Sequence, residues 1–333
     1  MYRVIDTVSI DAVSITGYYL YEKTPEESDV DADLMKSEVR EVRLEQGVVR
    51  YGEVGTGPVL LFVHGVLANG TLWRDVVASL SGRFRCIVPD LPLGGHSIPM
   101  RPDADLTLPG VARIVADLMK ALDLREVTLV GNDTGGAVCQ VVISEHPGRV
   151  SHLVLTNCDA YEAFFPVLLS PFHYAAAFFG TRFVDFLAWT LRIRLAQRVL
   201  LKTVATRHID EAALDAYARP LIENSGVRRD LARFLRGVSK RYTLEAARSF
   251  PGFRRPVLIV WGDRDLFFSP RLALRLQRDF PNARLEAVSG SRAFVPEDRP
   301  ECLAELIGEF VGEGVGRSRT ASGGSRGEVI SGD

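Results

Sequence analysis

Five continuous runs of apolar residues constrain the fold of this chain more than any other feature. They occupy residues 58–65, 84–92, 126–133, 150–159 and 256–265, and a shorter sixth run covers 283–290. A run without polar alternation is expected for a strand that is buried on both faces of a sheet. Helical patterns lie between the runs, at residues 71–80, 108–123, 135–147 and 269–280. This alternation predicts a doubly wound, mostly parallel α/β sheet, in which sites form at the carboxyl ends of the strands.

A long helical segment interrupts the alternation after the fourth run. Residues 160–247 contain no clear strand and are dense in large apolar side chains, most of all in YEAFFPVLLSPFHYAAAFFGTRFVDFLAWTLRIRL (161–195). An apolar helical insertion after a central strand is typical of a lid over the end of that strand, and extra core is the alternative. The sheet core then comprises residues 39–159 and 248–313, and its first part (39–55) has the period-2 pattern of a hairpin.

Both ends of the chain are predicted to lie outside that core. In the N-terminal extension (1–38), residues 22–33 are acidic and poor in large apolar groups, which favours a flexible linker. Residues 7–21, just before them, have a pattern that would allow pairing as a strand. Residues 314–333 are rich in Gly, Ser and Arg, so we expect a disordered tail.

Composition excludes several classes of partner. The net charge of −2 gives no electrostatic reason to expect nucleic acid binding. The four cysteines are scattered without a CxxC pair, which argues against a metal site and against a disulfide framework. No apolar stretch reaches the roughly 18 residues that span a bilayer, and no signal peptide pattern is present. We therefore expect a cytoplasmic protein without cofactor, metal or membrane partner, and the sequence leaves open whether it forms a homodimer.

The sequence VGNDTGGAV (130–138) joins the third strand to the helix that follows it. The pattern G-x-D-x-G around Asp133 is typical of a sharp strand-to-helix turn that presents a side chain at the end of the strand. Gly131 and Gly135 let neighbouring backbone pass close by, and the helix N-terminus favours a negative charge. A carboxylate at this place can attack carbon directly and form an ester. The alternative is that Asp133 merely caps the helix that begins near Thr134.

Six motifs in order resemble the α/β-hydrolase fold, and within it the epoxide hydrolases and haloalkane dehalogenases, which use an aspartate nucleophile. They are FVHGVLANGTLWRDV (62–76), DLPLGGHS (90–97), LVGNDTGGA (129–137), LVLTNCD (153–159), VWGDRDLFFSP (260–270) and SRAFVPEDRPE (291–301). The resemblance covers roughly residues 45–312. It implies an α/β-hydrolase core with a helical lid inserted after a central strand.

The resemblance also implies roles for individual residues. Asp133 would be the nucleophile and Asp265 the catalytic acid, with Asp159 in reserve. The backbone N–H groups of Val66 and Thr134 would form the oxyanion hole. Haloalkane dehalogenases typically carry halide-stabilising Asn and Trp at the positions of Val66 and Thr134, so the resemblance disfavours dehalogenation.

The histidine of the family is absent from its usual place. It would lie five residues before Asp298, where this chain has Ala293, and no histidine follows His208. An ester on Asp133 is cleaved by water that a base activates, so without that base the intermediate should accumulate. Three explanations stay open: a deliberate exchange of histidine for alanine, a natural protein that uses another base, or a protein that is not a hydrolase.

Three other residues are candidates for substitute or lid groups. His96 follows the second strand and would approach the site from its loop, although an exposed loop residue is the plainer interpretation. His173 lies in the apolar insertion, where packing is the alternative. Tyr174 is beside it, and epoxide hydrolases use lid tyrosines to protonate a leaving oxygen; ordinary packing is again the alternative.

The sequence therefore predicts a hydrolase of a small or medium apolar substrate, such as an epoxide, an ester or a related electrophile. The Phe, Leu and Trp content of the insertion supports an apolar substrate pocket. Ala293 makes the hydrolytic step impaired or unconventional. One alternative is a non-hydrolytic catalyst of secondary metabolism, a cyclase or lyase, in which Asp133 acts as acid or base. The other is a catalytically silent protein that binds a ligand in the same pocket.

Overall fold

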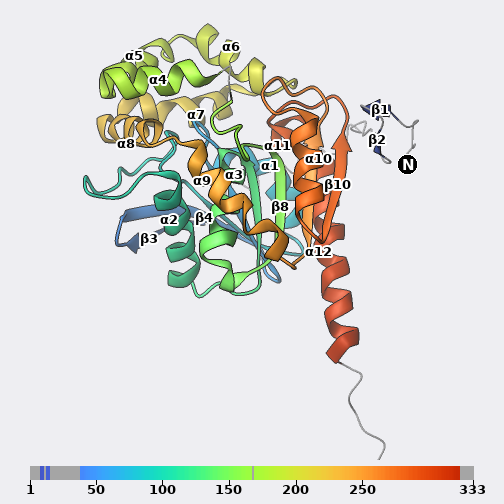
Figure 1. The fold of residues 1–333 in the computed structure, drawn as a ribbon. Coiled ribbons are helices and arrows are strands. Elements are labelled where there is room, and N and C mark those ends of the chain that lie inside the picture. Colours follow the sequence, from blue (N-terminus) through green and yellow to red (C-terminus); the bar gives the residue numbers. More distant parts are fainter. Residues whose placement is uncertain (1–7, 11–12, 16–37, 167–168, 323–333) are drawn as a thin grey trace, which may run out of the picture.

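A mostly parallel sheet forms the centre of the molecule (Figure 1). The computed structural model describes residues 8–10, 13–15, 38–166 and 169–322, with side chains as far as residue 312. Within this part the main sheet has eight strands in the order β10-β9-β8-β7-β5-β6-β4-β3. The strands are β3 (Glu38–Leu44), β4 (Gly47–Val54), β5 (Val59–Val63), β6 (Arg85–Pro89), β7 (Val127–Asp133), β8 (Val150–Cys158), β9 (Val257–Gly262) and β10 (Ala283–Val288).

The sheet confirms the predicted doubly wound α/β architecture. The strands from β5 to β10 pair in parallel, whereas β3 and β4 form the predicted antiparallel hairpin, whose second strand pairs with β6. All six residues of β9 are buried, as its uninterrupted apolar sequence requires. On one face α2 (Leu108–Ala121) packs against α3 (Thr134–Glu145), and on the other α1 (Arg74–Leu80) packs against α12 (Pro300–Ser322).

The strand order reverses between β5 and β7. From β5 the chain crosses to β6 on one side and then returns to β7 on the other side of β5. The loops that follow β5 and β7 therefore open a crevice at the carboxyl ends of adjacent strands, which is where ligands bind in open α/β sheets. The short helix η3 (Gly70–Trp73) contacts β5 beside this region and also α11 (Val295–Asp298), while the longer α10 (Pro270–Asp279) packs on β9 and β10.

The insertion after β8 is helical in its described residues. It contains α4 (Ser170–Phe179), α5 (Thr181–Thr190), α6 (Arg194–Val204), α7 (Glu211–Glu223), α8 (Ser225–Arg236) and α9 (Lys240–Ala247). Figure 1 shows α4 to α8 stacked over one end of the sheet, with α4, α5 and α6 outermost and α7 and α8 closer to the core. The last helix before the predicted boundary at 247, α9, packs against α3, where Thr243 and Ala246 are buried.

Two predictions concern the ends of the chain. Short strands β1 (Val8–Ile10) and β2 (Val13–Ile15) pair as a separate antiparallel ribbon, while the predicted acidic linker at 22–33 lies outside the described residues. The tail was predicted to begin at 314, and α12 continues to Ser322. Residues 323–333 lie outside the described part. No helix in the described ranges combines the length and the apolar character that crossing a membrane requires.

At Gly136, near its start, α3 packs so tightly on β8 that a side chain does not fit. A Cβ on Gly136 would lie 2.3 Å from the Cβ of Cys158. We expect Gly136→Ala to lower the free energy of unfolding by about 2–3 kcal/mol, measured by urea denaturation, because the buried strand must shift. Gly148→Ala is the matched control, since a Cβ there meets nothing within 4 Å, and it should change stability by less than about 0.5 kcal/mol. Equal effects of the two substitutions would contradict this explanation.

Candidate active site

Asp133 stands on a sharp turn between β7 and α3. Its backbone has φ 55° and ψ −131°, a conformation that residues with a side chain rarely adopt and that the surrounding structure must hold in place. Its side chain makes no hydrogen bond to the second or third N–H group of α3, which an N-cap side chain ordinarily satisfies, and this argues against Asp133 as a mere helix cap. The turn leaves the carboxylate at the carboxyl end of the central strand.

Glycines make room for this turn. A Cβ on Gly65, in the loop after β5, would lie 2.0 Å from the Asp133 carboxylate oxygen Oδ2. A Cβ on Gly135 would lie 2.1 Å from the carbonyl oxygen of Val63, and one on Gly131 would lie 2.8 Å from the Sγ of Cys139. The two glycines of the G-x-D-x-G pattern are therefore needed for close backbone approach, as the sequence predicted.

The two N–H groups predicted as oxyanion-hole donors both donate to the Asp133 carboxylate. The Val66 N–H lies 3.2 Å from Oδ2, and the Thr134 N–H also donates to this side chain. Burial raises the pKa of Asp133 to about 7, against the lowering effect of these two N–H groups, and the negative charge of Asp265 adds to the rise. Asp133 is thus a buried carboxylate that changes its protonation state near neutral pH.

Asp265 lies in the loop after β9 and is fixed by two hydrogen bonds. Its Oδ2 accepts from the side-chain amide of Asn157 at 2.6 Å, and its Oδ1 accepts from the N–H of Phe267 at 2.7 Å. Burial raises its pKa, although these hydrogen bonds oppose the shift. The adjacent Arg264 N–H donates to the Ser291 carbonyl at 2.9 Å, so this loop is tied to the loop that carries position 293.

Asp159, the reserve acid, is fully buried behind the turn. Its Oδ2 accepts a hydrogen bond from the Thr134 hydroxyl at 2.8 Å, and its Oδ1 has no partner among the described residues. Burial, and next the charge of Asp133, raise the pKa of Asp159 well above the usual value. Asp159 is thus enclosed beneath the turn and bonded to Thr134, whereas Asp265 lies on a loop that is tied to the loop of position 293.

Ala293, at the position of the family's histidine, lies beside the Asp133 turn. The side-chain amide of Asn132 donates to the Ala293 carbonyl at 2.7 Å, and Ala293 itself is buried. Asp298 holds the same loop, because its Oδ2 accepts from the Arg292 N–H at 2.8 Å and its Oδ1 from the Thr206 N–H at 2.7 Å. The loop is thus fixed to both the sheet and the insertion. The methyl side chain of Ala293 offers no acid or base.

The predicted substitute groups do not line the cavity described below. His96 is buried rather than exposed, because α8 covers its loop and places Asp230 Oδ2 3.4 Å from its Nε2. The Nδ1 of His173 hydrogen-bonds the Leu235 carbonyl at 2.7 Å. Tyr174 is 66% exposed, so the helix turns it to solvent and not toward Asp133. The structure leaves all three away from the site.

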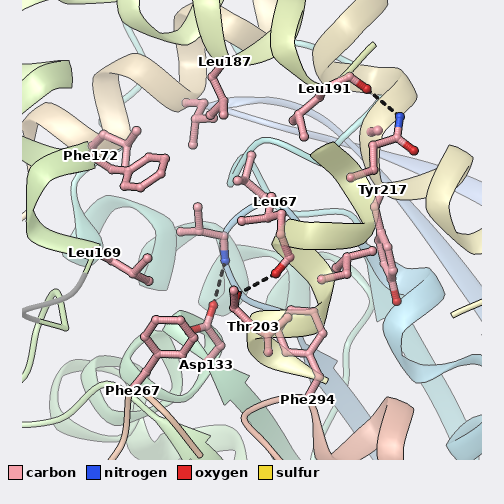
Figure 2. Close-up of a pocket in the computed structure, with 18 of the residues that line it drawn as sticks. Leu67, Asp133, Leu169, Phe172, Leu187, Leu191, Thr203, Tyr217, Phe267 and Phe294 are labelled. Carbon is pink, nitrogen blue, oxygen red and sulfur yellow. Dashed lines mark hydrogen bonds between the residues drawn. The ribbon is translucent and has the colours of Figure 1, made fainter. Parts of the chain in front are cut away.

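An apolar cavity lies between the insertion and the sheet (Figure 2). The volume of this cavity is about 110 Å³. One water molecule needs roughly 10–15 Å³ on the same measure, so the cavity has room for a small ligand. Figure 2 shows Asp133 at one end, with Leu169, Phe172 and Leu187 around the space above it. Polar side chains also line the cavity, and their partners are internal: Gln197 Nε2 donates to the Leu191 carbonyl, and the Thr203 hydroxyl donates to the Leu200 carbonyl.

A buried polar network, which was not predicted from the sequence, lies at the wall of the cavity. Tyr217, on α7, lines the cavity and donates its phenol O–H to Glu297 Oε1. The two oxygens of Glu297 accept from the Arg74 guanidinium at 2.6 and 2.9 Å. Glu297 belongs to the quoted SRAFVPEDRPE motif, but no local signal indicated which helix of the insertion would meet it. This network ties α7 to the core beside position 293.

Comparison with known proteins identifies the family. The model of the alpha/beta hydrolase fold family matches residues 58–300, which is more than half of the chain. The chain belongs to this family. Among the residues that the structure describes, no group of three or more His, Cys, Asp or Glu side chains is placed to hold a metal ion.

Relatives come from both branches that the motifs resemble. Haloalkane dehalogenase 2 of Mycobacterium tuberculosis is 29% identical over 287 residues, which cover 82% of this chain and 95% of that protein. Epoxide hydrolase 3 of Xenopus tropicalis is 24% identical over 280 residues, covering 78% and 74%. The solved structure of the epoxide hydrolase CorEH superposes with a TM-score of 0.72 at 18% identity, covering 84% of this chain and 99% of that one, and shows the shared fold.

The raised pKa of Asp133 predicts a pH-dependent stability. The unfolded carboxyl ionises near pH 4, whereas the folded one does so at about 7, so wild-type protein loses stability as the pH rises between these values. Asp133→Asn removes this titration. The variant should therefore gain stability relative to wild type across this window, by up to roughly 4 kcal/mol, as measured by urea unfolding at each pH.

A control separates this effect from a general response to losing a carboxylate. Asp103 is exposed, and its hydrogen bond to Arg101 lowers its pKa. It is ionised in both states above about pH 4, so the effect of Asp103→Asn should stay constant over the same window. A constant difference for Asp133→Asn as well would contradict a raised pKa at the site.

Proposed function

We propose that this protein is a hydrolase in which Asp133 attacks an electrophilic carbon of a small or medium apolar substrate, such as an epoxide or an ester. The observation that carries this proposal is the position of the Asp133 carboxylate. It is the one charged side chain among the described residues that line the apolar cavity, and the strained turn directs it there. A carboxylate needs no separate base to act as a nucleophile.

The proposed first step uses groups that are already in place. One carboxylate oxygen of Asp133 forms a bond to a saturated carbon of the substrate, a ring carbon of an epoxide or the alkoxy carbon of an ester. The bond from that carbon to its leaving oxygen breaks, its electron pair stays on the leaving oxygen, and an alkoxide so formed takes a proton from solvent. The Val66 and Thr134 N–H groups, which donate to the carboxylate before reaction, would stabilise the oxyanion when water later adds to the ester carbonyl. The fixed loop of Asp265 supports its role as the acid, whereas the enclosure of Asp159 and its hydrogen bond from Thr134 support a structural role.

Ala293 limits the second step of this scheme. Cleavage of the ester needs activated water, and the described histidines lie outside the cavity lining. The side chain of Ala293 cannot accept a proton. We therefore expect the ester on Asp133 to form and to persist.

Dehalogenation is the weaker possibility within the same chemistry. Val66 lines the cavity with an aliphatic side chain, and the hydroxyl of Thr134 donates to Asp159 instead of the cavity. Neither side chain supplies an N–H donor for a departing halide. The relatives that carry the name haloalkane dehalogenase are less than a third identical to this chain, so their substrate does not transfer directly.

One observation favours a second candidate, a non-hydrolytic cyclase or lyase. With a pKa of about 7, Asp133 would be partly protonated at neutral pH and able to give or take a proton. Such a reaction has no need of activated water, which suits an alanine at position 293. In that case no covalent ester would form, and isomerised or cleaved products would contain no solvent oxygen.

Covalent trapping tests the proposal directly. We expect intact-protein mass spectra to show a stable adduct after incubation with members of a panel of epoxides, activated esters and alkyl halides. The rate of adduct formation should rise with pH through about 7, as Asp133 ionises. Asp133→Asn, the matched control, should give no adduct. An adduct that persists in this variant would exclude Asp133 as the nucleophile, and its absence from both proteins would favour the second candidate.

Restoring histidine tests why the ester persists. Ala293→His should release the adduct and give multiple turnovers, since a general base typically accelerates its step by about 10²- to 10⁴-fold. Product release is measured by mass spectrometry in ¹⁸O-labelled water, with label entering the product after the first turnover. Ala293→Gln, of similar size but without basicity, should still accumulate adduct. If both variants are folded by circular dichroism and neither turns over, the missing histidine is not what blocks hydrolysis.

A further inference from the structure

The outer surface of the insertion is unusually rich in exposed apolar side chains. Ten large apolar side chains are exposed in the described part of the chain, and eight of them lie between Tyr174 and Val199. Phe178 is 84% exposed, Leu195 70% and Trp189 59%. Monomeric soluble proteins rarely expose a contiguous apolar patch of this kind without a partner for it.

These side chains form stripes on α4, α5 and α6. The stripes consist of exposed residues at helical spacing: Tyr174 and Phe178 on α4, Arg182, Phe186 and Trp189 on α5, and Leu195, Val199 and Lys202 on α6. Spacings of three and four residues put each set on one side of its helix. Figure 1 shows these three helices as the layer farthest from the sheet, with α7 and α8 beneath them. We call the surface formed by these stripes the outer face.

The outer face is also positively charged. Residues 170–204, which span the three helices, contain five basic residues and one acidic residue, although the whole chain has a net charge of −2. Arg182, Arg192 and Lys202 are exposed, and none of them has a carboxylate partner within ion-pair distance among the described residues. The acidic residue, Asp185, pairs with Arg228 of α8.

We propose that the outer face of α4, α5 and α6 binds the surface of an anionic lipid bilayer. Aromatic and aliphatic side chains interleaved with unpaired Arg and Lys are the composition of helices that lie in the membrane interface. Binding of a second copy through the same face would place its positive charges against each other, which the charge pattern opposes. The expectation of no membrane partner rests on the lack of a membrane-spanning stretch, and binding in the membrane interface needs no such stretch.

The inner side of the same helices lines the cavity. Leu187 and Leu191, on and just after α5, and Phe172 on α4 face the space above Asp133. A bilayer on the outer face would therefore lie one helix layer away from the cavity, which suits an apolar substrate. The inference goes beyond the proposed function and does not depend on it, so Asp133→Asn should bind membranes as wild type does.

Trp189 provides a specific optical probe for the test. Of the three tryptophans, Trp73 and Trp261 are buried and Trp189 is exposed. With the full chain, vesicles of equal parts phosphatidylcholine and phosphatidylglycerol should shift the tryptophan emission to shorter wavelength and protect it from acrylamide. Vesicles of phosphatidylcholine alone should give a much smaller change, and added salt should weaken the effect. No shift with the anionic vesicles would overturn the proposal.

Paired variants test which groups bind. Arg182→Ala and Lys202→Ala should each lower the vesicle partition coefficient roughly fivefold, the factor expected for one basic residue near an anionic surface. Phe178→Ser and Phe186→Ser should weaken binding to anionic vesicles without changing the fold, since both side chains are exposed. Arg113→Ala on α2 and Val39→Ser on β3 are the matched controls, exposed but distant from the outer face, and should bind as wild type.

Self-association is the competing outcome. Analytical ultracentrifugation without lipid should show the same species for wild type and for Phe186→Ser. A dimer that Phe186→Ser dissociates and Arg182→Ala strengthens would assign the outer face to a second copy of the chain and overturn the proposal. Vesicle binding that is unchanged in all four outer-face variants would also overturn it.

Discussion

The backbone turn at Asp133 is the constraint on which the rest of the site depends. A residue with a side chain is held at φ 55° at the end of the central strand, which costs on the order of 1–3 kcal/mol. Pairing of β7 with β5 and β8, together with the buried start of α3, holds this conformation. The arrangement demands glycine at 65 and 135, because any Cβ would enter the carboxylate or the neighbouring backbone. The fold thus spends stability to place one carboxyl group.

Burial of several carboxyl groups without a cation determines the electrostatics of the site. Burial disfavours ionisation of Asp133, Asp159 and Asp265, the charge of Asp265 acts in the same direction on Asp133, and the charges of Asp133 and Asp265 do so on Asp159. A protonated histidine at position 293 would offset these charges. With Ala293 there, backbone N–H groups and the Asn157 amide are the stabilising partners, and they leave the pKa of Asp133 near 7. The same alanine therefore affects both the charge state of the nucleophile and the fate of any ester.

The sequence predicted the sheet and the Asp133 turn because both depend on local pattern. Strands buried on both faces have continuous apolar runs, and the turn needs glycines at fixed offsets from Asp133. The environment of His96 and the direction of Tyr174 were predicted less well, since they depend on how α8 and α4 pack, and a single sequence does not encode this packing locally. Tyr217 and Glu297 were missed for the same reason: their contact joins residues 80 positions apart.

The insertion shows why apolar periodicity alone could not distinguish a lid from additional core. In α5, Val184 and Ala188 are buried and Leu187 lines the cavity, while Phe186 and Trp189 lie on the opposite, exposed side. A helix that is apolar all round is ordinarily enclosed on all sides. Here α7, α8 and the cavity enclose the inner side, and no described residue covers the outer one. An apolar, negatively charged surface outside the helix would complement Arg182, Phe186 and Trp189 on the outer side of α5.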